Sequence, residues 1–189
     1  GARRMQWKRG ELIGHGAYGQ VFVALNLLSG ELMAVKQVIT NYHSEQSMDI
    51  TETDKTMQFL RKEIELMRSL DHPNIVRVIE TFVDFQRLHI VLERCAGGEL
   101  FDRVIDQGGY SEARARDLAL KICSALKYLH DNNIIHRDLK PDNVLVDAAY
   151  VAKLCDFGCA RFEDDSVTMT SETGTPLFSC PSLLRCERY

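Results

Sequence analysis

The stretch His136-Arg137-Asp138-Leu139-Lys140-Pro141-Asp142-Asn143, followed by Asp156-Phe157-Gly158, constrains this chain more than any other feature. Within six residues it sets a carboxylate, an ammonium and an amide, on Asp138, Lys140 and Asn143. A second carboxylate, Asp156, follows Asn143 by thirteen residues. This combination suits phosphoryl transfer, in which a protein supplies positioning and charge neutralisation and little covalent chemistry.

Composition and charge place the chain among ordinary globular proteins. It is 45% hydrophobic and 26% charged, and its 189 residues are enough for one domain or two small lobes. The formal net charge of −4 gives no reason to expect a nucleic-acid or membrane partner. None of the six cysteines forms a Cys-x-x-Cys pair, and no histidine lies at zinc-ligand spacing from them. No apolar run resembles a signal or a membrane span. We therefore expect reduced thiols and a cytoplasmic location.

Hydrophobic periodicity predicts strands and one helix in the first part of the chain. Residues 21–25 and 32–38 alternate between two faces, as strands do. The polar residues 39–53 indicate a mobile loop. A helix is expected from about Asp54 to Leu70, with one apolar stripe made of Met57, Leu60, Ile64 and Met67.

After this helix the pattern continues with two strands that fit an antiparallel sheet, and then changes to helices. Two strands come first, around 75–83 and 87–93. A short helix is expected from about Glu99 to Gln107, and a longer one after Ser111, which is a suitable N-cap. The longer helix carries an apolar stripe of Ala115, Leu118, Ile122, Leu126 and Leu129. A short hairpin is then expected from residues 144–146 and 151–154.

A glycine motif lies between the first two strands. Residues 14–21 match G-x-G-x-x-G-x-V, and glycines let backbone amides approach phosphate oxygens closely. The strand–turn–strand context argues against a dinucleotide-binding fold and favours a flap over ATP. Taken alone, the motif fits a plain hairpin turn equally well.

Two charged residues are expected to face inward. Lys36 shares a strand face with apolar residues, and Glu63 lies at the edge of the apolar helix stripe. Because an unpaired buried charge is costly, each favours the other as its partner. The alternative for each residue alone is that Lys36 extends to the surface and that Glu63 is an ordinary stripe-edge residue.

The residues of the opening motif have distinct expected roles. Asp138 is the candidate base for a substrate hydroxyl, and Lys140 would steady the transferring phosphoryl group. Asn143 and Asp156 would hold magnesium ions, which prefer oxygen ligands. A single acidic loop residue is more often solvated turn chemistry. That reading fails here because five elements occur in the right order: glycine flap, strand lysine, helix glutamate, catalytic loop and Asp-Phe-Gly.

From about Trp7 onward the chain resembles a eukaryotic-type serine/threonine protein kinase domain. The resemblance implies an α+β bilobal fold, with an antiparallel β-sheet N-lobe and one helix in residues 1–93. A hinge and an incomplete, mainly helical C-lobe would occupy residues 94–189. Lys140 resembles the serine/threonine branch. The first forty residues are similar to MAP kinase kinase kinases, and the central part is similar to calmodulin-dependent kinases.

The resemblance also implies a site for ATP and Mg²⁺. Cys95 and Glu93 match the hinge that pairs with adenine, and Glu99 matches a residue that meets the ribose. Lys36 with Glu63 would hold the phosphates, and Val21, Ala34 and Leu145 would enclose the adenine. The nucleotide-binding set is therefore expected to be Ile13, Gly14, Gly16, Gly19, Val21, Ala34, Lys36, Glu93, Cys95, Glu99, Asn143, Leu145 and Asp156.

The resemblance to the family also bears on regulation by phosphorylation and on the binding of the protein substrate. Arg137 resembles kinases that are activated by phosphorylation, and Ser171 matches the usual position better than Thr168, Thr170 or Thr173. An unmodified polar loop is an equal alternative. Ser182 stands where the family has a glutamate that anchors the substrate-binding segment, and the chain is expected to be truncated after Tyr189.

Two functions from different classes follow. The first is a serine/threonine kinase that transfers the γ-phosphate of ATP to a protein hydroxyl, with an upstream kinase acting on Ser171 or a nearby threonine. The second is an ATP-binding interaction module with little catalytic activity, in the manner of a pseudokinase. The motifs up to Gly158 favour the first, and Ser182 favours the second.

Overall fold

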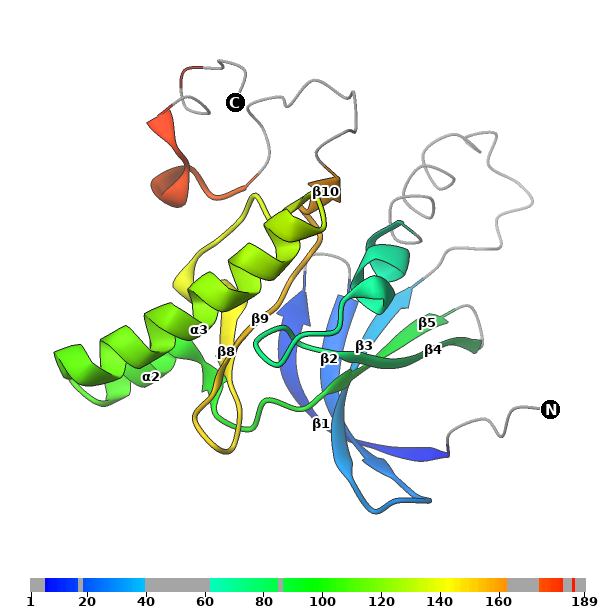
Figure 1. Ribbon diagram of the computed structural model, residues 1–189. Helices are drawn as coiled ribbons and strands as arrows, with labels where there is room; N and C mark the ends of the chain where they lie inside the picture. The colour runs from blue at the N-terminus through cyan, green and yellow to red at the C-terminus, as the bar shows by residue number, and fades with distance from the viewer. Residues whose placement is uncertain are drawn as a thin grey trace. The chain divides into compact units, whose positions relative to one another are not determined.

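The computed structural model of the chain describes residues 6–16, 19–39, 62–84, 87–162, 174–181 and 185 (Figure 1). These residues form two compact units. The first unit comprises the described residues of 1–70 and 77–94, and the second comprises 71–76 and those of 95–189. The division into domains 1–93 and 94–189 stays a prediction.

The first unit contains one five-stranded antiparallel sheet, which confirms the predicted α+β fold class. Its order is β1-β2-β3-β5-β4. The strands are β1 (Trp7–Gly16), β2 (Gly19–Asn26), β3 (Leu32–Ile39), β4 (Val78–Asp84) and β5 (Arg87–Glu93). Asn26 shapes the turn into β3, because its Oδ1 accepts hydrogen bonds from the amides of Leu28 and Ser29.

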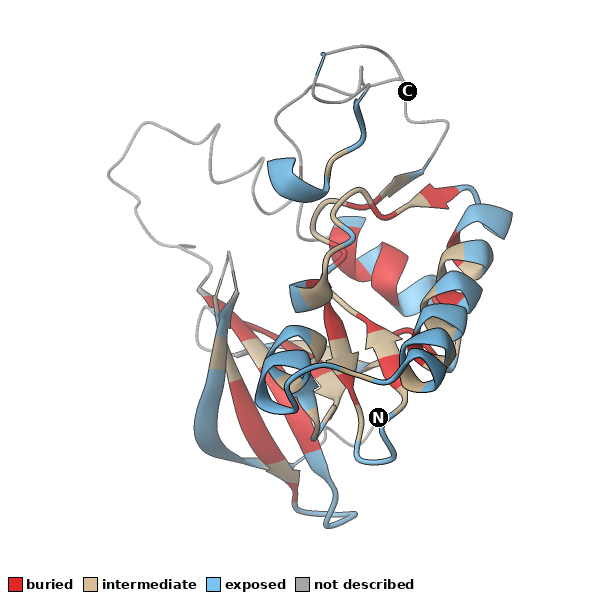
Figure 2. Cartoon of the chain, turned by 90° about the vertical axis from the view of Figure 1, so that its left-hand side faces the viewer, coloured by how far each residue is buried: buried red, intermediate tan, exposed pale blue. Residues whose placement is uncertain are grey.

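Buried residues lie along the middle strands of this sheet (Figure 2), and they form clusters on both of its faces. One face packs against the helical residues 62–69, where Ile64 joins a cluster with Val38, Leu88 and Ile90. The other face carries a second cluster of Ala24, Met33, Val35 and Val91, against which Trp7 and Phe82 pack. The period-2 pattern of the sequence thus identifies which residues share a face.

The described part of the predicted helix ends at residue 69, one residue before the expected end at Leu70. Its first residues, 54–61, and the polar residues 40–53 lie outside the described residues. Glu63 is buried and only 4% exposed, so it is not an ordinary residue at the edge of the stripe. A buried carboxylate needs compensation from nearby charge.

The prediction for β4 was wrong at its start. The strand begins at Val78, three residues later than expected. Ile75 instead forms an isolated parallel bridge with Leu154 in the second unit, and the amide of Val76 donates to the Leu154 carbonyl at 2.9 Å. The backbone hydrogen bonds of residues 75–76 therefore go to another strand, which local periodicity cannot indicate.

The second unit combines two helices with short strands and turns. The helices are α2 (Leu100–Asp106) and α3 (Glu112–Asp131), and two 3₁₀ turns are η1 (Pro141–Asn143) and η2 (Pro176–Phe178). The strands are β6 (Gly98–Glu99), β7 (Ile134–Ile135), β8 (Val144–Val146), β9 (Ala152–Leu154) and β10 (Arg161–Phe162). They pair as β6-β8-β9 and β10-β7. Among the described residues no helix has the length and apolar character to cross a membrane.

Helix α3 begins as predicted and buries a slightly different stripe. Ser111 caps it by accepting a hydrogen bond from the Arg114 amide at 3.3 Å. Leu118, Ala125 and Leu129 are its buried residues, and the helix contacts β7 and β9. Ala115, which was expected in the stripe, is exposed.

Residues 71–76 are held against the second unit by side chains from α3 and by the β8–β9 hairpin. His72 Nε2 lies 3.2 Å from Ser124 Oγ, and the Asp71 amide donates to the Tyr128 hydroxyl at 3.0 Å. Nδ2 of Asn74 donates to the Ala152 carbonyl at 2.9 Å. This segment therefore contacts both α3 and the hairpin.

Candidate active site

In the first unit the structure brings Lys36 and Glu63 together. Lys36 Nζ lies 3.6 Å from Glu63 Oε1, and the two side chains are 15% and 2% exposed. Among the described residues neither Glu63 oxygen has a hydrogen-bond partner. The ion pair is therefore the compensation that the structure offers this buried carboxylate.

The glycine motif joins β1 and β2 in a hairpin, with Gly16 paired to Gly19. A Cβ atom on Gly19 would lie 1.9 Å from the Gln37 carbonyl oxygen, so close packing against β3 already requires glycine there. Ile13 and Gly14 lie on β1, and Ile13 is half exposed. Ala17 and Tyr18, at the tip of the motif, lie outside the described residues.

Val21 and Ala34 share a sheet face with Lys36. Val21 is the cross-strand partner of Lys36, and Ala34 precedes Lys36 by two residues on β3. At the end of β5, Oε1 of Glu93 accepts a hydrogen bond from the Arg77 amide at 2.7 Å. The Glu93 side chain thus holds the backbone at Arg77 beside the end of β5.

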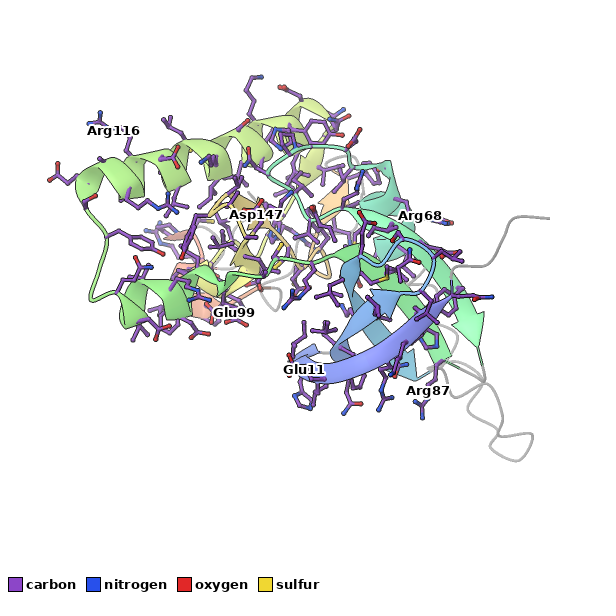
Figure 3. The ribbon with its side chains drawn as sticks, turned by 90° about the horizontal axis from the view of Figure 1, so that it is seen from below. Glu11, Arg68, Arg87, Glu99, Arg116 and Asp147 are labelled. Carbon is purple, nitrogen blue, oxygen red and sulfur yellow. The ribbon has the colours of Figure 1, made fainter. Side chains whose placement is uncertain are left out.

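In the second unit Cys95 and Glu99 flank a glycine turn. The Gly98 amide donates to the Cys95 carbonyl at 3.2 Å, and Glu99 pairs with Leu145 as β6 meets β8. Glu99 lies at the start of α2 (Figure 3). Burial raises the pKa of Glu99, and the nearby carboxylates of Asp102 and Asp142 raise it further.

Asp138 is the centre of a four-residue network. Thr175 Oγ1 donates to Asp138 Oδ1 at 2.7 Å. Lys140 Nζ lies 3.0 Å from Asp138 Oδ2 and donates to Thr175 Oγ1 at 2.8 Å. Nδ2 of Asn143 donates to Asp138 Oδ2 at 2.9 Å and to the Asp138 carbonyl at 2.8 Å. The network joins residues 138–143 to the segment that leads into η2.

Sequence reasoning missed Thr175. Thr175 lies within the Gly-Thr-Pro of residues 174–176. The available signal was a hydroxyl residue held between glycine and proline at the end of a polar stretch. That signal is weak, because 37 residues separate Thr175 from Asp138 and only folding brings them together.

The network shifts the ionisation of its charged members. Burial alone would raise the pKa of Asp138, but hydrogen bonds from Thr175, Lys140 and Asn143 and the charge of Lys140 outweigh it and lower that pKa. Burial alone would lower the pKa of Lys140, but Asp138, with Asp142 and Asp156, raises it. Both groups are therefore kept charged at neutral pH.

His136 connects this loop to the Asp-Phe-Gly motif. Its Nδ1 accepts the Asp138 amide at 3.3 Å, and its Nε2 lies 3.1 Å from the Cys155 carbonyl. Burial lowers the pKa of His136 despite opposing effects of Cys155, Asp156 and Asp138. The ring also meets Phe157 edge to face, with centroids 5.1 Å apart. A neutral ring protonated on Nε2 satisfies both polar contacts.

Asn143 and Asp156 present oxygens suited to a hard cation. Both hydrogen bonds of the Asn143 side chain are donated by Nδ2, which leaves Oδ1 as an acceptor among the described residues. The Asp156 carboxylate is exposed and accepts the Gly158 amide at 3.3 Å. Asp156 has φ of 58° and Arg137 has φ of 65°, a left-handed backbone that non-glycine residues adopt rarely and mostly where structure imposes it.

The comparisons with known proteins agree with this geometry. The family model for the protein kinase domain matches residues 7–189. This chain belongs to the protein kinase domain family. In this kinase domain the predicted catalytic loop and the Asp-Phe-Gly motif both belong to the second unit. Ser171, Thr168, Thr170, Thr173 and Ser182 lie outside the described residues.

The curated relatives of this kinase domain include a MAP kinase kinase kinase and a calcium-dependent protein kinase. It is 38% identical over 95% of its length to mitogen-activated protein kinase kinase kinase ANP1 of Arabidopsis thaliana. It is 37% identical over 92% of its length to calcium-dependent protein kinase 3 of Plasmodium yoelii yoelii. The chain spans 27% and 31% of these two relatives. The predicted resemblance to MAP kinase kinase kinases is confirmed.

Proposed function

We propose that the protein containing this domain is a serine/threonine kinase that transfers the γ-phosphate of ATP to a hydroxyl of a protein substrate. The observation that carries the proposal is the network of Asp138, Lys140, Asn143 and Thr175. The names of the relatives support the same reaction, including the serine/threonine-protein kinase TIO of Arabidopsis thaliana, which is 38% identical over 95% of the chain and of which the chain spans 13%.

Asp138 would orient the substrate hydroxyl and accept its proton. An ionised carboxylate offers about four acceptor positions. Thr175 occupies one on Oδ1, whereas Lys140 and Asn143 occupy those on Oδ2. Among the described residues, Oδ1 keeps one position for a hydroxyl. Because the pKa of Asp138 is lowered, proton transfer becomes favourable late, as the hydroxyl oxygen bonds to phosphorus.

Lys140 would neutralise charge on the phosphoryl group in flight. Its ammonium is held by Asp138 and Thr175, so its position is set before substrate binds. Lys36, steadied by Glu63, would bind the nucleotide phosphates. Mg²⁺ would be held by Asn143 Oδ1 and the Asp156 carboxylate, and when bound it would neutralise phosphate charge.

The remaining nucleotide contacts are also part of the proposal. Ile13, Gly14, Gly16 and Gly19 would cover the phosphates. Val21, Ala34 and Leu145 would enclose the adenine, the backbone of Glu93 and Cys95 would pair with it, and Glu99 would meet the ribose. A cytoplasmic location and activation by a kinase that modifies Ser171 or a nearby threonine belong to the same proposal. Digestion of the active protein and mass spectrometry test the last point, and an unmodified loop would contradict it.

A second candidate is an ATP-binding interaction module with little catalysis. One sequence observation favours it, namely Ser182 at the position where the family has an anchoring glutamate. Both candidates require ATP binding, so they differ only in transfer.

The experiment compares the intact protein with its Asp138→Asn variant. Mg–ATP should raise the melting temperature of both proteins, because a ligand that binds the native state stabilises it. Phosphate transfer to a serine or threonine peptide that is lost in Asp138→Asn supports the kinase. ATP binding with no transfer above that variant supports the interaction module. No thermal shift with Mg–ATP contradicts both.

A further inference from the structure

The turn at residues 95–98 belongs to the proposed nucleotide site, and a side chain of α2 contacts it. Cys95 and Gly98 close the turn by a backbone hydrogen bond of 3.2 Å, and Gly98 has φ of 75°. Glu99 follows directly. Any displacement of this turn would therefore move the Cys95 backbone and the Glu99 side chain together.

Gly97 is held on both sides of its peptide group. Its amide donates to the Val146 carbonyl of β8 at 2.8 Å, and a Cβ atom there would lie 2.6 Å from that oxygen. Its carbonyl accepts a hydrogen bond from Nε of Arg103. One bond is thus made by a strand backbone, and the other is made by a charged side chain.

Arg103 can reach Gly97 because of where it lies on α2. It is four residues after Glu99, and side chains on a helix lean toward the N-terminus of that helix. Arg103 is partly buried, whereas none of the residues of α2 is fully buried. The N-cap residue Glu99 also makes no side-chain capping bond. A seven-residue helix with so little packing depends on bonds of this kind for its position.

We propose that Arg103 is a positioning residue for the ribose end of the nucleotide site. It holds the Gly97 carbonyl and thereby sets the Cys95 backbone and the Glu99 carboxylate, without touching the nucleotide itself. The inference rests on the proposed function, since it assigns Arg103 to the proposed ATP site.

The test measures Mg–ATP and Mg–2′-deoxy-ATP affinity and steady-state kinetics in the intact protein, for Arg103→Ala, Arg103→Lys and Glu99→Ala. Arg116→Ala is the matched control, because Arg116 lies on α3 and its exposed side chain points outward (Figure 3). Arg103→Ala should raise the KM for ATP about tenfold with little change in kcat, as expected for losing one charge-assisted hydrogen bond. Arg103→Lys should recover part of the loss, because an ammonium can still donate to the carbonyl.

The ribose readout separates positioning from general stability. We expect the preference for ATP over 2′-deoxy-ATP to fall in Arg103→Ala and in Glu99→Ala, and the double variant to resemble Glu99→Ala alone. Amide exchange at Gly98 should rise in Arg103→Ala without nucleotide. An unchanged KM and ribose preference, additive effects in the double variant, or a loss of kcat and melting temperature alone would each overturn the proposal.

The same experiment keeps the two proposals apart. If the wild-type protein binds Mg–ATP but Arg103→Ala binds it equally well, only the role of Arg103 fails. If the wild-type protein does not bind Mg–ATP, the proposed function fails and the role of Arg103 fails with it.

Discussion

At the residue scale, Thr175 contributes to both the geometry and the lowered pKa of Asp138. Its hydroxyl donates to Asp138 and accepts from Lys140, so one oxygen bridges the two charged groups. The hydroxyl adds a second link between a carboxylate and an ammonium that already form an ion pair at 3.0 Å, and so restrains both side chains further. Small changes at Thr175 should therefore alter catalysis more than nucleotide binding.

We expect Thr175→Ala to lower kcat about 10- to 100-fold, the cost of losing a hydrogen bond to a charged group, with the KM for ATP nearly unchanged. Donors such as Thr175 lower the pKa of Asp138. Removing one raises that pKa, so activity should begin to fall at a higher pH on acidification. A pH profile of kcat measures both effects. Thr175→Ser should behave like the wild type, and an Ala variant with wild-type kcat would contradict the assignment.

The ion pair of Lys36 and Glu63 gives a prediction about stability. Glu63 is buried, and neither of its oxygens accepts a hydrogen bond from a described residue. Lys36→Met should lower the free energy of unfolding by about 3 kcal/mol, because it leaves a buried charge uncompensated. Glu63→Gln in the same background should recover part of this loss. Urea titration measures both, and a double variant that is less stable than Lys36→Met would contradict the argument.

At the element scale, the segment 71–76 shows how a connection can belong to a different unit from its neighbours. It leaves a helix of the first unit and precedes β4 of the same unit, yet its hydrogen bonds go to α3 and to the β8–β9 hairpin. His72 is a titratable residue of this segment. Its Nδ1 accepts the Asn74 amide at 3.1 Å, which requires that nitrogen to be unprotonated.

The pH dependence of this attachment follows from the direction of the shift. Burial lowers the pKa of His72, and the charge of Lys153 lowers it further. The pKa of His72 is therefore lower in the folded protein than in the unfolded chain. At pH values above the unfolded pKa, His72 makes its full contribution to the free energy of unfolding. This contribution is lost as the pH falls toward the folded pKa, because the unfolded chain is protonated first. Stability should therefore fall less between pH 7.5 and about 5 in His72→Gln than in the wild type. Chemical denaturation at both pH values tests this, with the exposed His130→Gln as control, and equal losses in His72→Gln and wild type would contradict it.

Local signals predicted the elements well where the residues that decide them are close in sequence. Ser111 caps α3, and the hairpin of β8 and β9 forms at the expected residues. Local signals failed at residues 75–77, because the bridge from Ile75 to Leu154 competes with extension of β4 and spans 79 residues of sequence. The buried stripe of α3 shifted for the same reason, since the strands beside it decide which side is covered.

At the scale of the whole molecule, the thiols are unlinked within the described residues. Cys95, Cys123, Cys155, Cys159 and Cys180 form no disulfide there, and Cys123 and Cys180 are exposed. The described residues of each unit are therefore held by packing, hydrogen bonds and ion pairs, with no disulfide among them. The melting temperature should be the same with and without a reducing agent when measured promptly after purification. A lower value in the reducing agent would reveal a disulfide and contradict the expected reduced state.

The sequence by itself determined the family, the order of the chemical groups and the sheet, because these depend on short motifs and on local periodicity. It predicted Asp138, Lys140 and Asn143, which lie within six residues, and the structure brings these three together. Only the tertiary structure decided that Thr175 completes their network, that residues 71–76 join the second unit and that Arg103 holds Gly97. These contacts depend on which backbone groups are left to be satisfied once the elements pack, and neighbouring residues along the chain carry no record of that.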